Sequence, residues 1–228
     1  VNDSILLSNV LLSDAVMFEM LFPKEASFVV KAYEEFTLQS ATSIAERFGR
    51  DLNHISRVSS VALEIYDKMK KLHGYKLRER TLLQVSAILQ DIGKYVNVKN
   101  HALLSYNTIT NLDIVGINDH ERLIISYSLL LPQRKYSKYD SLFTINLVRK
   151  DRVMVSKLAA ILQISNAINT SHSPKFEQVN VNMKNGKLNI YLTTLKNINL
   201  EKWAFIAKSK LFREVYGLNA TIIKRGVL

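Results

Sequence analysis

Basic side chains are the residues of this sequence whose chemistry stands out first. The chain carries 31 Lys and Arg against 20 Asp and Glu, which gives a formal net charge of +11. Arginine binds phosphate oxygens through a planar fork of donors, and lysine binds them as a point charge. The candidates for such contacts are Arg50, Arg57, Lys94, Arg134 and Lys135. If they converge, they would line a groove for a chain of phosphates. The alternative is that they are spread over a solvated face, as charged residues usually are.

A second candidate is the run Leu89–Lys94, which reads Leu-Gln-Asp-Ile-Gly-Lys. It resembles the metal-binding signature of HD-type phosphohydrolases, Leu-His-Asp-Ile-Gly, with a glutamine in place of the histidine. Those enzymes take a His from one helix, a His-Asp pair from a second helix and an Asp from a late helix. The resemblance places His54, Gln90, Asp91 and Asn166 at these positions. An imidazole is a good ligand for a transition metal and an amide is a weak one. We therefore expect a vestigial site and no bound metal.

The composition of the 228 residues is that of a soluble protein with one large domain or two small ones. No apolar run is long enough to cross a bilayer, and Val1–Ser4 does not read as a signal peptide. The absence of cysteine excludes disulfides, thiolate nucleophiles and Cys-based zinc sites. We expect a cytoplasmic protein without membrane contact, cut from a longer chain.

Apolar residues that recur every three or four positions predict a series of amphipathic helices. We expect these helices from residue 24 onward and at 55–73, 77–89, 101–112, 119–131 and 151–168. In the first helix the side chains expected to face the core are Val29, Val30, Tyr33, Phe36 and Leu38. Glycine and proline, at 7 and 3 residues, are too scarce for a fold of many short strands.

After Pro174 the hydrophobic period changes from helical to alternating. Residues 179–183 and 188–192 read as two strands, and the Asn-Gly pair between them predicts a hairpin turn. A helix at 200–216, with Trp203 in the core, and a strand at 220–223 complete the chain. The prediction is a mainly α fold, with an HD-like all-α domain over 24–173 and a small α+β cap over 174–228. Residues 1–23 are expected to be the remnant of a preceding domain.

Several short motifs follow one another along the chain: Asn53–Val58, Leu72–Gly74, Leu89–Gly93, Ser105-Tyr106, Leu158–Leu162, Asn166–His172 and Leu200–Trp203. Together they resemble the C-terminal half of the exopolyphosphatase/guanosine pentaphosphate phosphatase (Ppx/GppA) family. The run Leu11–Ala15 is similar to the strand and turn that end the family's actin-like catalytic domain. His101 is the one histidine kept from a His-rich family segment, and it joins the basic residues as a candidate substrate contact.

The resemblance implies what the parent protein does. It would hydrolyse terminal phosphate from inorganic polyphosphate or pppGpp in an N-terminal actin-like half, with a divalent metal such as Mg²⁺. This chain lacks that half, which would be its partner in cis. The C-terminal part would bind the polyanion and form a homodimer, with no cofactor and no catalytic residue of its own.

Other functions remain open. A working HD phosphohydrolase acting on a nucleotide would need a metal, against which Gln90 and Asn166 argue. The charge permits RNA binding, although no glycine-aromatic signature of an RNA-recognition motif is present. A structural domain that meets an acidic partner is a third alternative. At the residue level, His54 can bond to backbone and Asp91 can pair with Lys94 or Arg57. His73 and His120 are expected at the surface.

Overall fold

The computed structural model describes residues 17, 20–21, 23–132, 147–184 and 186–226. Within these ranges it confirms a mainly α fold followed by a small α+β part. The strand and turn expected near Leu11–Ala15 lie outside the described residues, as do the candidate contacts Arg134 and Lys135.

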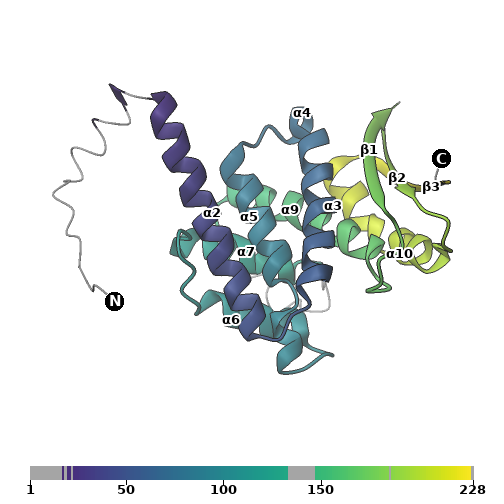
Figure 1. Ribbon diagram of the computed structural model, residues 1–228, viewed down its shortest axis with the longest axis horizontal. Helices are drawn as coiled ribbons and strands as arrows, with labels where there is room; N and C mark the ends of the chain where they lie inside the picture. Colours follow the sequence, from purple (N-terminus) through teal and green to yellow (C-terminus); the bar gives the residue numbers. More distant parts are fainter. Residues whose placement is uncertain (1–16, 18–19, 22, 133–146, 185, 227–228) are drawn as a thin grey trace, which may run out of the picture.

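The helical part is a bundle around one central helix (Figure 1). Its elements are α2 (Pro23–Arg47), α3 (Leu52–Lys68), α4 (Lys70–His73), α5 (Leu77–Leu89), the 3₁₀ turn η1 (Ile92–Tyr95), α6 (His101–Thr110), α7 (Asp119–Leu130) and α9 (Arg149–Ile168). Helix α9 contacts α3, α5 and α7. Its residues Leu158, Ala159 and Ala160 are fully buried, because neighbours cover more than one side of the helix.

The C-terminal part is a three-stranded sheet with one helix. Strands β1 (Gln178–Lys184) and β2 (Lys187–Thr193) form the predicted antiparallel hairpin. Helix α10 (Asn199–Tyr216) then crosses over to β3 (Asn219–Arg225), which pairs in parallel with β2. Figure 1 shows this part at the end of the bundle beside α3, and α10 packs directly against α9.

One hydrophobic core runs through both parts. Leu188 and Ile190 of β2 and Phe212 of α10 are fully buried and belong to the same cluster as the bundle residues. The structure changes from helix to strand between Ile168 and Gln178, around the expected boundary. That 24–173 and 174–228 are separate domains stays a prediction.

The prediction that the apolar side chains of α2 are buried is wrong for three residues. Val30, Tyr33 and Phe36 are 44%, 51% and 61% exposed. Helix α2 packs against α5, and its fully buried residues there include the small Ala41 and Ala45. The spacing of apolar residues shows that they share a face, but only the tertiary structure decides which face is covered.

Two further side chains differ from expectation. Trp203 is 71% exposed on α10, whose buried residues include Phe212. His73 is buried: its Nδ1 accepts the Tyr75 N–H at 3.0 Å, so its Nε2 donates to the Tyr66 carbonyl at 2.8 Å. These two bonds satisfy both nitrogens of the neutral ring, so His73 can be buried. The polarity of histidine alone would predict a position at the surface. His120 is exposed, as expected.

Candidate functional site

The segment after α5 is held in place by close packing on α6. The Gly93 N–H donates to Ser105 Oγ at 2.9 Å, and this hydroxyl donates to the Gln90 carbonyl at 3.1 Å. A Cβ atom at residue 93 would collide with the His101 carbonyl and the Ser105 nitrogen. Only glycine fits there, and the packing sets Gln90, Asp91 and His101 side by side.

Asp91 is the electrostatic centre of the site. Its side chain is 6% exposed, and its Oδ2 lies 2.7 Å from Lys94 Nζ and 3.3 Å from Arg50 Nη2. The pairing with Lys94 is therefore confirmed, and Arg50 rather than Arg57 is the second partner. A buried carboxylate is tolerated when cations compensate it in this way.

His101 reaches the same carboxylate from the start of α6. Its Nδ1 lies 3.5 Å from Asp91 Oδ1, and its side chain is partly exposed. Burial lowers the pKa of the imidazole, although Asp91 opposes this shift. The ring is therefore neutral at neutral pH, and the contact is not an ion pair between full charges.

His54 stands in the first turn of α3, which Asp51 caps by accepting the Asn53 N–H. Its ring is 1% exposed and stacks on His172, with centroids 4.0 Å apart. Neither ring nitrogen of His54 has a partner among the described residues, so the expected bond to backbone is wrong. Burial, reinforced by His172, lowers the pKa of His54 to about 4. Arg57 stabilises this stack by donating to the His172 carbonyl at 3.2 Å.

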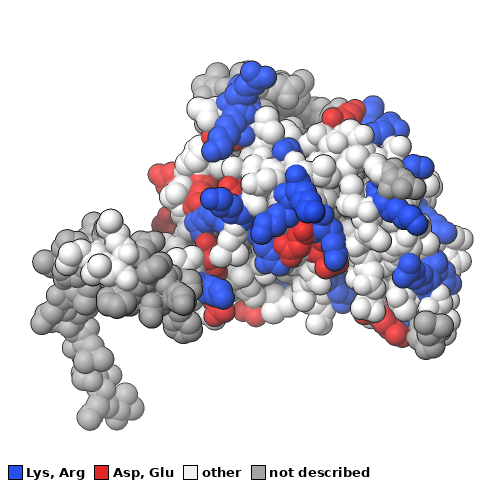
Figure 2. Space-filling view, turned by 90° about the horizontal axis from the view of Figure 1, so that it is seen from above, with Lys and Arg blue, Asp and Glu red and all other residues white. Residues whose placement is uncertain are grey.

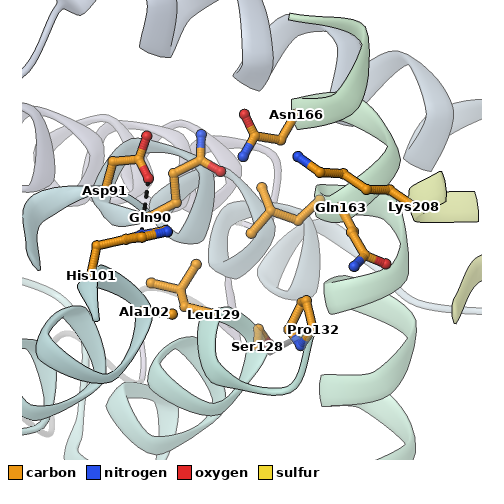
Figure 3. Close-up of a pocket in the computed structure, with 11 residues that line it drawn as sticks. Gln90, Asp91, His101, Ala102, Ser128, Leu129, Pro132, Gln163, Asn166 and Lys208 are labelled. Atoms are coloured by element: carbon orange, nitrogen blue, oxygen red, sulfur yellow. Dashed lines mark ion pairs between the residues drawn. The ribbon is translucent and has the colours of Figure 1, made fainter. Parts of the chain in front are cut away.

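A cavity of about 80 Å³ lies beside Asp91. Gln90, Asp91 and His101 line one side of it, α9 contributes Gln163 and Asn166, and α10 contributes Lys208. Figure 3 shows the Gln90 and Asn166 amides and the Lys208 ammonium directed toward one another, with Asp91 and His101 on one side. Three of the four positions of the vestigial metal site thus meet in one pocket, while His54 does not line it.

The structure gathers part of the predicted substrate contacts. Arg50, Lys94 and His101 surround Asp91, and Arg57 lies close enough to His54 to lower its pKa. Lys208 and Gln163 were not among the candidates. Gln163 stands one helical turn before Asn166 and hence on the same face, which is a signal the sequence does contain. Nothing local in the sequence brings Lys208 to Asp91.

The remaining positive charge is not confined to this site. Figure 2 shows one face of the molecule, on which Lys and Arg lie in several separate groups with acidic residues among them. Many basic residues therefore lie on a solvated charged surface. Arg50 and Lys94 converge on Asp91 but do not line the cavity, so the groove for a chain of phosphates stays a prediction.

The residues of the pocket do not fit the divalent metal that an HD-type site implies. In the described ranges, no three His, Asp or Glu side chains are grouped so that they could hold an ion. Asp91 Oδ2 is engaged by two cations, Gln90 and Asn166 offer only amides, and the Lys208 ammonium shares the cavity. The Lys208 ammonium in that place repels a second cation, so the pocket disfavours a bound metal ion.

Comparison with known families matches residues 38–211 to the Ppx/GppA phosphatase family, specifically to its domain III. The match covers most of the sequence, and the chain belongs to the Ppx/GppA phosphatase family. A search among curated proteins finds no match. In the part of the chain that the structure describes, no helix combines the length and apolar character needed to cross a membrane.

Proposed function

We propose that this chain is the substrate-holding part of an exopolyphosphatase-like hydrolase. The parent protein would remove terminal phosphate from inorganic polyphosphate or pppGpp, with catalysis in an actin-like half. Membership of the Ppx/GppA family supports this role. The observation that carries it is the surplus of cations around one buried carboxylate.

That surplus comes from four places in the fold: the segment after α2, helix α3, the turn η1 and helix α10. Arg50 and Lys94 bind Asp91 directly, Lys208 lies within its electrostatic surroundings, and Arg57 acts on His54, which Asp91 also influences. One carboxylate compensates only one unit of charge, so the site keeps a positive field that attracts polyanions. We propose that the chain binds such a polymer without hydrolysing it, forms a homodimer and works in the cytoplasm.

The test is binding of long-chain polyphosphate to the purified chain at low and high salt, with RNA as competitor. We expect binding that weakens steeply with salt, because phosphate contacts release counterions, and that resists RNA. The double substitution Arg57→Gln/Lys94→Gln should weaken it by about tenfold or more. The control Lys68→Gln removes an exposed charge near the far end of α3 and should change little.

Two outcomes would favour other functions. No binding at low salt would refute substrate capture and leave assembly of the parent protein as the role. Equal displacement by RNA would instead support the RNA-binding alternative. Metal analysis of the purified protein tests the HD-type alternative, since a stoichiometric divalent metal would contradict the pocket chemistry described above.

A further inference from the structure

The pocket beside Asp91 contains a buried donor that no group in the described ranges uses. Gln90 is 7% exposed, and its Nε2 has no hydrogen-bond partner among the described residues. An unpaired buried N–H group costs free energy, and such groups are rare in native proteins. In Figure 3 the Gln90 amide lies beside Asn166, with its oxygen on the side of Lys208 and Nε2 turned away from that side. A half-turn of the amide would bring Nε2 to the pocket, where a ligand would satisfy it.

Lys208 supplies charge to the same space. It comes from α10, is partly buried, and makes no ion pair within the described part of the chain. Burial lowers the pKa of its ammonium, while the Asp91 carboxylate raises it. Because Arg50 and Lys94 already compensate Asp91 at 3.3 and 2.7 Å, the Lys208 charge is left to attract an anion.

The pocket also offers acceptors, which restrict the kind of anion. The Asp91 carboxylate forms part of the lining, whereas the Gln163 amide lies at its edge with Oε1 turned away from the Lys208 ammonium (Figure 3). A fully deprotonated oxyanion would be repelled by the carboxylate oxygens. An oxyanion that keeps one O–H can donate to one of them while its other oxygens accept from Lys208 and Gln90. The volume of the pocket, about 80 Å³, exceeds several-fold the roughly 10–15 Å³ that one water needs, so a larger ligand has room there.

We propose that this pocket is a metal-independent site for a single hydrogen phosphate group, bound by Lys208 and Gln90 as donors with an oxygen of Asp91 as acceptor. The inference deepens the proposed function and rests on it for the source of the group, which is free orthophosphate or the end of a polyphosphate chain. Internal phosphates of such a chain carry no proton at neutral pH, so the pocket distinguishes chain ends from chain interiors.

The first experiment is calorimetric binding of orthophosphate and of sulfate to the full chain, in buffer with a metal chelator. Phosphate should bind about tenfold tighter than sulfate, because sulfate has no O–H to donate at neutral pH. Lys208→Gln should weaken phosphate binding by about tenfold. The matched control is Lys202→Gln, which removes the same charge from an exposed position of α10 and should change binding by less than about twofold.

A second variant shows whether a loss of phosphate binding is caused by misfolding. Gln90→Met removes the amide at nearly constant volume, and it should also weaken phosphate binding while the thermal unfolding temperature stays close to that of the unmodified chain. Equal affinity for phosphate and sulfate would overturn the proposal. Equal effects of the Lys208 and Lys202 substitutions would overturn it too.

Two further probes identify the source of the group. Linear tripolyphosphate has terminal groups and cyclic trimetaphosphate has none. If only the linear form displaces bound orthophosphate, the pocket binds the terminal groups of a chain, as proposed. Displacement by both forms would contradict this selectivity for chain ends. If long polyphosphate binds but the pocket variants leave orthophosphate binding unchanged, only the pocket proposal fails. If orthophosphate binds in the pocket and long chains do not, only the proposed function fails.

Discussion

The stacked pair of His54 and His172 makes the stability of the protein depend on pH. The pKa of His54 is about 4 in the folded chain and about 6.5 in an unfolded one. The unfolded state therefore takes up a proton first, and stability falls as the pH drops from 6.5 toward 4. The loss should reach about 3 kcal/mol at most, because one pKa unit corresponds to about 1.4 kcal/mol.

Urea unfolding at pH 7.5 and at pH 5 measures this loss. His54→Phe keeps an aromatic ring in the stack and removes the titrating group, so the variant should lose less stability than the unmodified chain over the same interval. Equal losses in both proteins would show that His54 does not carry the effect.

Asp91→Asn should separate stability from ligand binding. The amide leaves Arg50 and Lys94 without a negative partner, and we expect a loss of about 2 kcal/mol in the free energy of unfolding. The same change adds one unit of positive charge to the site, so polyphosphate binding should become tighter at low salt. Denaturation and binding measured on one sample check both results, and weaker binding would contradict the proposed role of the cations.

At the scale of elements, the close contact between η1 and α6 depends on the absence of a side chain at Gly93. Gly93→Ala places a methyl group against the backbone of His101 and Ser105, which cannot yield as a flexible side chain would. We expect a loss of about 2 kcal/mol or more. Gly226→Ala adds the same atom in open space and should change stability by less than about 0.5 kcal/mol. Chemical denaturation of both variants tests the contrast.

The two faces of α10 should respond very differently to substitution. Phe212 is fully buried, and its change to alanine should cost about 3–5 kcal/mol. Trp203 is 71% exposed, and its change to glutamine should cost less than about 0.5 kcal/mol. A large loss from the Trp203 substitution would show that this side chain is covered in the protein in solution.

Local signals explain which elements could be predicted from the sequence. The stripe from Ile55 to Tyr66 is buried as its spacing requires, and the hairpin follows from turn chemistry next to alternating strands. The exposure of Phe36 and Trp203 could not be predicted. The spacing of apolar residues shows that they share one face of a helix, but not whether another element packs against that face. In the site, Asp91 and Gln90 were found through a local motif, whereas Lys208 reaches them from another part of the fold.

At the scale of the whole molecule, the shared core predicts one cooperative unfolding transition. Residues of β2 and α10 are buried in the same cluster as those of α3 and α9, so neither part can lose its packing without exposing the other. Hydrogen exchange of Ile190 in β2 and Leu158 in α9 should report similar opening free energies. Clearly lower protection in the sheet would instead support two separately folding domains.

The late position of α10 also has a consequence for synthesis on the ribosome. Chains fold from the N-terminus as they emerge, and α9 is complete before the helix that packs against it has been made. A nascent or truncated chain that stops before Asn199 would leave an apolar flank of α9 open to solvent. Such intermediates are natural clients of chaperones and proteases, so prematurely terminated products of this chain should be cleared rather than accumulate.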